Sequence, residues 1–254
     1  MKDLLNQILN INCLDGLKLI DDSSIDLVVT SPPYNLAIPY DEYDDSKAIK
    51  DYSEFISNVS KELYRVLKSD GRVCINVPCD GKMEETKVDI GYLIRDIFYN
   101  VGFNYKDLIL WDKNHLSSRN AWGSFGSASC PNILLPFEEI IVFYKGDKNK
   151  HKKEGNGIKE LIDKDFIEYT NGHWRIDGEK AKDKTKYPCP VPFPQEIPKR
   201  LIQLYSYRDD IVLDPFSGNG TTCIVAKKLG RNFIGFELSK EYVTKSIKNL
   251  NRLT

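Results

Sequence analysis

Short apolar runs rich in β-branched residues alternate along the chain with longer stretches in which apolar positions recur every three to four residues. The short runs are typical of buried strands and the longer stretches of amphipathic helices. The predicted strands cover residues 8–12, 26–29, 72–77, 105–111, 139–144, 211–213 and 232–237. The predicted helices cover residues 49–68, 88–101, 196–205, 221–229 and 240–250. This alternation predicts an α/β fold with a mostly parallel, twisted sheet, right-handed crossovers and helices on both faces.

The alternation breaks between residues 112 and 185. Residues 112–127 are polar and rich in Gly and Ser, and residues 145–187 lack apolar periodicity. The second stretch holds twelve Lys or Arg residues and nine Asp or Glu residues, which gives it a modest positive charge. We therefore expect one body made of residues 1–111 and 186–254, interrupted by an insert over 112–185.

Composition narrows the class of protein without naming a substrate. The 254 residues are 41% hydrophobic and 29% charged, which is typical of a globular chain that buries one core. The net charge of −1 does not mark a nucleic-acid binder, so affinity for DNA would depend on a local patch. The six cysteines form no C-x-x-C pair and there are three histidines, so neither a disulfide framework nor a metal site is expected. Without a signal sequence or a long apolar run, we expect a cytoplasmic protein with no membrane partner.

Residues 30–35 read Thr-Ser-Pro-Pro-Tyr-Asn and follow the predicted strand 26–29. Two prolines end the strand at its carboxyl end, which is where ligands bind in open α/β sheets. The Ser31 hydroxyl and the Pro32 carbonyl can accept hydrogens from the amino group of a nucleobase while Tyr34 stacks on the ring. The alternative is a proline-rich turn that ends the strand, with Tyr34 as a packing residue.

A second stretch combines an acid, two glycines and a helix start. Asp214 ends the predicted strand 211–213, and Gly218 and Gly220 allow the backbone to pass close to a ligand. Glu237 ends the next strand, where an acid can accept ribose hydroxyls. In a dinucleotide-binding loop an acid at Asp214 would repel phosphates. A cofactor with a positive amino group and sulfonium, such as S-adenosylmethionine, suits this carboxylate better.

Together the two stretches resemble the catalytic and cofactor motifs of S-adenosylmethionine-dependent DNA amino-methyltransferases. The order, with the catalytic motif first, is similar to the beta group of that family. The resemblance covers residues 26–111 and 186–250 and implies a Rossmann-like class I methyltransferase fold with an inserted target-recognition region. It also implies that the target base rotates out of duplex DNA and that its amino nitrogen attacks the cofactor methyl in line, without a metal or a covalent enzyme intermediate.

The resemblance implies roles for individual residues. The catalytic motif corresponds to Ser31, Pro32, Pro33 and Tyr34. The implied cofactor contacts lie at strand ends, in the glycine loop and in the proline-rich segment: Asn12, Cys13, Ser31, Phe193, Asp214, Phe216, Gly218, Gly220, Thr221 and Glu237. The implied DNA contacts lie beside the catalytic motif and in the insert: Asn35, Arg119, Asn120, Trp122 and Arg175, with Trp174 as a second stacking candidate.

Two local features have alternative interpretations, and two helix starts have a single one. Asn12 stands where the family has an acid that contacts adenine, and it can make that contact or cap the following helical turn. Residues 36–47, which are acidic and aromatic, form either a loop that folds over the site or a solvated connection. Thr221 and Thr222 are expected to cap the helix that they open, and Ser239 to cap the last helix.

A Ser before the two prolines resembles the motif of family members that modify cytosine N4. An Asp at this place is commoner in members that modify adenine N6. The prediction is therefore cytosine N4 methylation of duplex DNA, with adenine N6 as the alternative. The expected setting is a restriction–modification system with a cognate endonuclease, and the protein can act as a homodimer. More distant alternatives are an RNA or protein methyltransferase and a non-catalytic DNA-binding relative.

Overall fold

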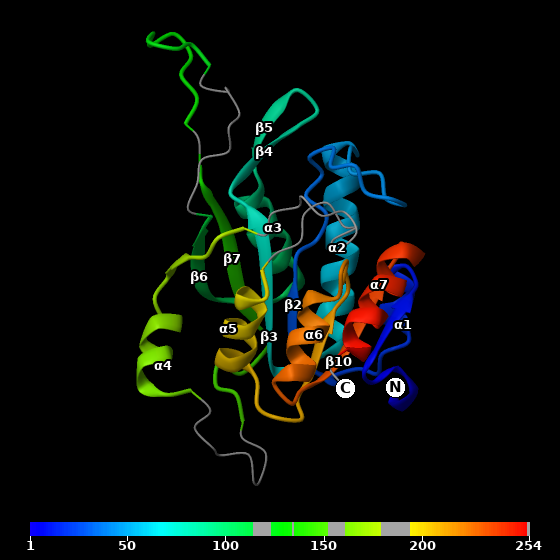
Figure 1. The fold of residues 1–254 in the computed structure, drawn as a ribbon. Helices are drawn as coiled ribbons and strands as arrows, with labels where there is room; N and C mark the ends of the chain where they lie inside the picture. Colours follow the sequence, from blue (N-terminus) through cyan, green and yellow to red (C-terminus); the bar gives the residue numbers. More distant parts are fainter. Residues whose placement is uncertain (114–122, 134, 152–160, 179–193, 253–254) are drawn as a thin grey trace.

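An eight-stranded sheet forms the centre of the molecule, with strand order β1-β10-β9-β2-β3-β7-β6-β8 (Figure 1). The computed structural model describes residues 1–113, 123–133, 135–151, 161–178 and 194–252. The sheet strands are β1 (Gln7–Asn10), β2 (Ile25–Thr30), β3 (Leu67–Pro78), β6 (Asn104–Asp112), β7 (Phe137–Tyr144), β8 (His173–Arg175), β9 (Ile211–Asp214) and β10 (Asn232–Glu237). A separate hairpin consists of β4 (Asp80–Met83) and β5 (Thr86–Asp89).

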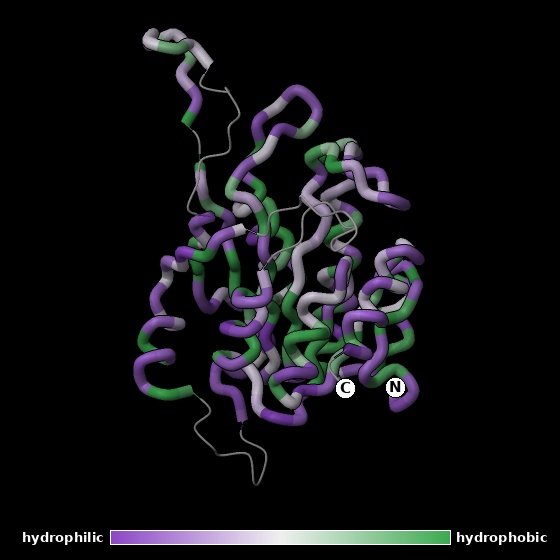
Figure 2. The backbone as a smooth tube through the Cα atoms, in the orientation of Figure 1, coloured by the Kyte–Doolittle hydropathy of each residue, from purple (hydrophilic) through white to green (hydrophobic). Residues whose placement is uncertain are grey.

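Helices cover both faces of this sheet. They are η1 (Lys2–Leu4), α1 (Cys13–Lys18), α2 (Ile49–Val66), α3 (Ile90–Val101), α4 (Asp163–Tyr169), α5 (Glu196–Tyr205), α6 (Thr221–Lys228) and α7 (Lys240–Asn251). Val28 packs in the cluster that contains α1, α2 and α3, whereas its neighbours Leu27 and Val29 pack in the cluster with α5, α6 and α7. Because successive strand residues point to opposite faces, this division places the two helix sets on opposite sides of the sheet. Figure 2 shows hydrophobic residues concentrated along the central strands.

The sheet is mostly parallel, as predicted. β1, β10, β9, β2 and β3 are parallel neighbours, and β8 is parallel to β6. β7 is antiparallel to both β3 and β6 and lies between them. Strand periodicity cannot show this, because a buried strand reads the same in either direction. The α/β class is therefore confirmed, and the antiparallel β7 is the feature that the sequence did not predict.

The boundary between α2 and β3 differs from the prediction. The helix ends at Val66, so residues 67 and 68, which were predicted to be helical, and residues 69–71, which were expected to end the helix, belong to β3. Leu67 is extended and fully buried, and it pairs with Ile25. An irregularity in the pairing after Ile25 accommodates the residues up to Arg72. Tertiary pairing of one buried leucine thus decides the helix end.

Two strands inside the predicted insert belong to the central sheet. β7 and β8 both fall within residues 112–185, so the expected boundaries divide the sheet. Trp174 on β8 is 1% exposed, and its indole N–H donates to the Tyr169 carbonyl at 3.2 Å. The prediction that Trp174 stacks on a base is wrong, because the ring is a core residue.

Among the described residues, no helix combines the length and the hydropathy needed to cross a bilayer.

Candidate active site

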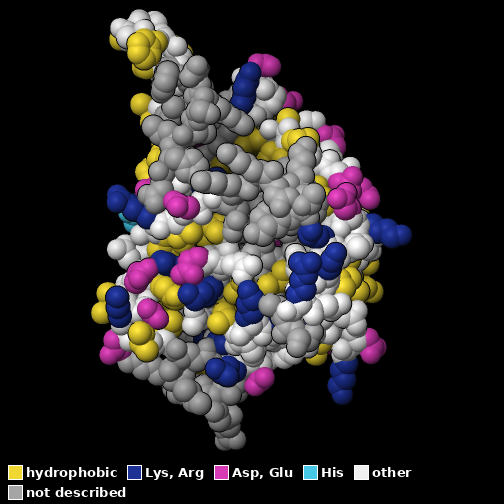
Figure 3. Space-filling model, in the orientation of Figure 1, with side chains coloured by type: hydrophobic (Ala, Val, Ile, Leu, Met, Phe, Trp, Pro, Cys, Tyr) yellow, Lys and Arg dark blue, Asp and Glu magenta, His cyan; other side chains and the backbone are white. Residues whose placement is uncertain are grey.

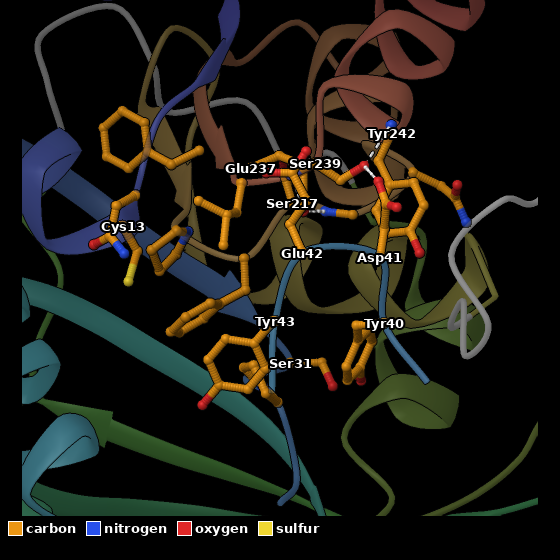
Figure 4. A pocket seen from close by; sticks show the side chains of 18 of the residues that line it. Cys13, Ser31, Tyr40, Asp41, Glu42, Tyr43, Ser217, Glu237, Ser239 and Tyr242 are labelled. Carbon is orange, nitrogen blue, oxygen red and sulfur yellow. Dashed lines mark hydrogen bonds between the residues drawn. The ribbon is translucent and has the colours of Figure 1, made fainter. Parts of the chain in front are cut away.

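One pocket lies where the carboxyl ends of β1, β2, β9 and β10 meet (Figure 4). Parallel strands bring their carboxyl ends to one edge of a sheet, and the segments that follow these four strands form the wall. The lining residues are Ile11, Asn12, Cys13, Ser31, Pro33, Tyr34, Tyr40, Asp41, Glu42, Tyr43, Phe55, Pro215, Phe216, Ser217, Gly218, Asn219, Thr221, Phe236, Glu237, Leu238, Ser239 and Tyr242. The catalytic motif and the glycine loop, far apart in sequence, therefore share one cavity.

The pocket brings together most of the residues predicted to contact the cofactor. Those in its wall are Asn12, Cys13, Ser31, Phe216, Gly218, Thr221 and Glu237. Pro32, Asp214 and Gly220 lie next to lining residues without being among them. Phe193 lies outside the described residues.

Glu237 is held rigidly at the end of β10. Its two carboxylate oxygens accept from the Gly218 and Ser239 amides, each at 2.8 Å. Burial raises the pKa of Glu237, while these amide donors oppose the rise. The carboxylate thus ties the glycine loop to the start of α7 and remains part of the pocket wall (Figure 4).

Asp214 lies beneath the glycine loop. It is 1% exposed, accepts from Thr30 Oγ1 at 2.7 Å and from the Phe216 amide at 3.2 Å. Burial raises its pKa to about 6. The expectation that Asp214 faces the cofactor cation is corrected by this position, because the carboxylates in the pocket wall are those of Asp41, Glu42 and Glu237.

Helix caps around the pocket agree with two of the three expectations. The Asn12 side chain accepts from the Leu14 amide at 2.9 Å and caps α1, so the capping alternative is confirmed for a residue that also lines the pocket. Ser239 caps α7 as predicted. The predicted Thr221 and Thr222 caps are wrong, because α6 begins after Gly220 without a side-chain cap.

Gly220 explains why this helix start needs glycine. Its φ of +73° lies in the left-handed region, which disfavours residues with a Cβ. A Cβ there would also lie 2.9 Å from side-chain atoms of Ile8 and Ser246. The turn is therefore set by backbone conformation and close packing, and Thr222 Oγ1 instead donates to the Val29 carbonyl at 3.3 Å.

The catalytic motif is fixed by hydrogen bonds from helix α2 and from strands β3 and β7. Ser31 Oγ and the Tyr34 hydroxyl are 2.7 Å apart, and the Tyr52 hydroxyl donates to the Pro33 carbonyl at 2.9 Å. The Tyr34 ring lines the pocket, while its hydroxyl is bonded to the buried side chains of Asn76 and Glu138. Burial, followed by the Glu138 charge, holds the pKa of Tyr34 well above its usual value, so the hydroxyl keeps its proton.

Asp45 organises the loop after the catalytic motif. Its carboxylate is 2% exposed and accepts from the amides of Asn35, Leu36 and Ile38 at 2.8, 3.0 and 3.1 Å. The Asn35 side chain exchanges two hydrogen bonds with the Lys47 backbone, each at 2.7 Å. The assignment of Asn35 to DNA binding is therefore wrong, because its side chain is buried and committed to this loop.

Residues 36–47 form a wall of the pocket. Tyr40, Asp41, Glu42 and Tyr43 line it, and Ser239 Oγ donates to Asp41 Oδ2 at 2.6 Å (Figure 4). The alternative of a solvated connection is thus not what the structure shows. The sequence offered a loop over the site as one of two alternatives for residues 36–47 but assigned none of them to the cofactor; the signal for them was two tyrosines within an acidic loop.

Arg175, a candidate DNA contact of the insert, is not among the residues that line this pocket. Arg175 ends β8, with its side chain exposed and its Nε 3.6 Å from Asp112. Arg119, Asn120 and Trp122 lie outside the described residues. Over the ranges that the structure describes, no group of His, Cys, Asp and Glu side chains could hold a metal ion.

The donor and acceptor set fits S-adenosylmethionine. Three wall carboxylates provide acceptors for a positive amino group and for ribose hydroxyls. Ser217 Oγ is buried and has no hydrogen-bond partner among the described residues, as expected for a group that faces a polar ligand. The aromatic side chains of Tyr43, Phe55 and Phe216 offer surfaces for an adenine ring.

Comparisons with known proteins agree with this geometry. The family model described as DNA methylase matches residues 25–248. The Type II methyltransferase M.MjaVI of Methanocaldococcus jannaschii is 38% identical over 181 residues, which cover 68% of this chain and 91% of that protein. The Type II methyltransferase M1.MboII of Moraxella bovis is 30% identical and covers 98% of each chain.

A solved structure extends the likeness to the cofactor. TTHA0409 of Thermus thermophilus, complexed with S-adenosyl-L-methionine, aligns with a TM-score of 0.76 and 26% identity over 97% of this chain and 95% of that one. The class I methyltransferase fold is thereby confirmed, and S-adenosylmethionine is the cofactor. With its catalytic motif ahead of the cofactor loop, the chain belongs to the DNA methylase family, in the beta group of S-adenosylmethionine-dependent amino-methyltransferases.

Proposed function

We propose that this protein methylates the exocyclic N4 nitrogen of cytosine in duplex DNA, as the modification enzyme of a restriction–modification system. The observation that carries the proposal is the position of Ser31, whose hydroxyl lies in the wall of the cofactor pocket and is bonded to Tyr34 at 2.7 Å. A neutral hydroxyl before the prolines, in place of a carboxylate, is similar to the cytosine N4 members of the family.

The chain's own residues hold the base and aim its amine. Ser31 Oγ and the Pro32 carbonyl accept the two amine hydrogens, since the Pro33 carbonyl is already used by Tyr52. Rotating the base out of the duplex costs a few kcal/mol. Stacking on Tyr34, worth roughly 1–3 kcal/mol, offsets part of that cost. The bound cofactor would supply the electrophilic methyl group. As the amine nitrogen held in this geometry bonds to the methyl carbon in line, the carbon–sulfur bond would break, the uncharged thioether would leave and one amine proton would pass to solvent.

We assign the cofactor to the pocket on the same grounds. Glu237 accepts hydrogen bonds from the ribose hydroxyls, and Phe216 packs against the adenine. The backbone at Gly218 and Thr221 passes beside the cofactor. Asn12 and Cys13 complete the adenine side. Asp41 and Glu42 face the positive end of the cofactor, because both lie in the pocket wall on the loop that covers it.

DNA recognition is assigned to the segments that leave the sheet between β6 and β7 and between β7 and β8. The arm of residues 123–133 extends beyond the carboxyl ends of β2 and β3 (Figure 1), and the pocket residues lie at the same end of the sheet. Phe125 is 85% exposed on this arm. Arg119, Asn120, Trp122 and Arg175 supply the base and phosphate contacts.

The surface charge supports a local mode of DNA binding. Figure 3 shows positive and negative side chains interspersed over the face in view. Asp41, Glu42 and Asp44 are exposed on the loop beside the pocket and repel phosphates there. The duplex is therefore expected to approach from the arm side of the pocket.

The test is to incubate the protein with isotopically labelled S-adenosylmethionine and mixed-sequence duplex DNA, and to identify the labelled nucleoside by mass spectrometry. N4-methylcytosine supports the proposal, and N6-methyladenine keeps the mechanism but reverses the base. Absence of label in DNA, with the cofactor bound, contradicts it and favours an RNA, protein or non-catalytic role. A cognate endonuclease of the same recognition sequence and a homodimeric form are part of the proposal, and sedimentation with and without DNA tests the latter.

A further inference from the structure

A buried carboxylate lies next to the catalytic motif. Glu138 on β7 is 5% exposed. It accepts from the Tyr34 hydroxyl at 3.1 Å and from Asn76 Nδ2 at 2.5 Å, and its other oxygen pairs with the Lys113 ammonium. Glu138 and Asn76 lie on β7 and β3, and Tyr34 and Lys113 lie in the segments that follow β2 and β6, so the network is fixed by the fold.

The protons of this network can be counted. A carboxylate paired with an ammonium group carries no proton and can only accept hydrogen bonds. Tyr34 has one hydroxyl proton, and the contact with Glu138 requires it. Asn76 Nδ2 also donates to the Tyr34 oxygen, at 2.9 Å. The Tyr34 oxygen therefore acts as an acceptor toward every neighbour except Glu138.

The same count sets the direction of the bond between Ser31 and Tyr34. Either oxygen could donate over that 2.7 Å distance if the pair were isolated. With the Tyr34 proton held by Glu138, Ser31 has to donate its own proton to Tyr34. The competing acceptor for Ser31, the Asn76 carbonyl, is farther away at 3.3 Å. The Ser31 oxygen then has lone pairs left for a group in the pocket and no proton to offer it.

We propose that Glu138 is a positioning residue that makes Ser31 a hydrogen-bond acceptor toward the target amine, by holding the Tyr34 proton. The inference rests on the proposed function and deepens it, since it explains how a neutral hydroxyl is restricted to accepting. It also gives a rule for selection: an amino group satisfies Ser31, whereas a carbonyl oxygen at the same place meets a second acceptor.

The test replaces Glu138 with an isosteric group that can either donate or accept. In Glu138→Gln the amide can donate to Tyr34, which frees the tyrosine proton for Ser31. The matched control is Glu139→Gln, because Glu139 is the next residue on β7, points to the opposite face and pairs with Arg95 at 2.6 Å. We expect Glu138→Gln to lower the single-turnover methylation rate about 10- to 100-fold, as misplacement of a reacting group does. The cofactor Kd and the Tm should remain those of the control.

A double-mutant cycle with Tyr34→Phe separates this role from a structural one. Tyr34→Phe removes the relay while leaving Glu138 paired with Lys113, so adding Glu138→Gln to it should lower the rate less than about twofold further. The inference is overturned if Glu138→Gln is as active as Glu139→Gln, or if the losses of the two variants multiply. The inference is also overturned if the wild-type protein transfers no methyl group to DNA. That failure of the proposed function can be distinguished from the other outcomes, because the control Glu139→Gln would then be inactive as well.

Discussion

The acidic side chains near the cofactor pocket differ in depth, and depth decides what each one does. Glu237 is in the wall and bonded to two backbone amides, whereas Asp214 is buried beneath the glycine loop, next to Thr30. Both carboxyls have raised pKa values because burial disfavours the charged form. Glu237 is thus accessible from the pocket, whereas Asp214 supports the glycine loop from beneath.

The buried Asp214 should make the stability of the protein depend on pH. Its pKa is about 6 in the folded protein against an ordinary value of 3.8, so the folded state holds the proton more tightly than the unfolded state. As pH rises from about 4 to 6, the free energy of unfolding should fall, by up to about 3 kcal/mol. In Asp214→Asn this fall should be absent. Urea unfolding at several pH values tests this, and parallel curves for the two proteins would contradict it.

Tyr34 should be needed for turnover and dispensable for the cofactor. In Tyr34→Ala the stacking surface is lost, so methylation of DNA should fall by at least about tenfold, in line with roughly 1–3 kcal/mol of stacking. The cofactor Kd, measured by calorimetry, should change less than about threefold. A large loss of cofactor affinity would show that the ring belongs to the cofactor site instead.

At the scale of elements, the sequence predicted regular structure well and the pocket loop poorly. The sequence predicted α2, β9 and β10 correctly, because buried residues recur at regular spacing along α2 and follow one another in β9 and β10. Residues 36–47 carry no period, and their conformation depends on Asp45 reaching back to the amide of Asn35. The place of β7 was also beyond the sequence, because it is set by partners far along the chain.

The loop should lose its shape when Asp45 is removed. Asp45→Ala leaves three backbone amides without their acceptor. Each N–H group that stays buried without a new acceptor destabilises the loop by about 1–3 kcal/mol. We expect the cofactor Kd to rise at least about tenfold, which corresponds to about 1.4 kcal/mol. Asp44→Ala is the matched control, since Asp44 is exposed and bonds only to Ser46 among the contacts described. Equal affinities of the two variants would exclude the loop from the cofactor site.

The projecting arm should serve DNA alone. Gly123 and Pro131 are bridged, and the Ser124 amide donates to the Cys130 carbonyl at 2.9 Å, so residues 124–130 can be replaced by two glycines across a closed base. The Tm and the cofactor Kd should stay unchanged, while methylation of duplex DNA should drop at least about tenfold. Full activity of the shortened protein would remove the arm from the recognition region.

At the scale of the whole molecule, the pocket is assembled from four distant parts of the chain. Its lining residues fall within the segments 11–13, 31–43, 215–221 and 236–242, and Phe55 on α2 joins them. No short fragment carries this set, so the unfolded chain cannot bind the ligand in the same way.

Cofactor binding should therefore stabilise the entire fold. At about 100 times its Kd, S-adenosylmethionine should add about 2.7 kcal/mol to the free energy of unfolding. For a chain of this size the Tm should rise by about 5–10 °C, which thermal denaturation measures. ATP is the control, because its phosphates are repelled by Asp41, Glu42 and Glu237. A comparable shift with ATP would point to a nucleotide-phosphate site instead.

The strand order also constrains how the protein is made. β9 and β10 fill the sheet between β2 and β1, yet both are synthesised long after the strands that they join. Until residue 237 has left the ribosome, β1 and one edge of β2 have no neighbours, and such edges can pair with other chains. We therefore expect chains truncated before β9 to aggregate and to lack a cofactor site, which expression of such fragments would test.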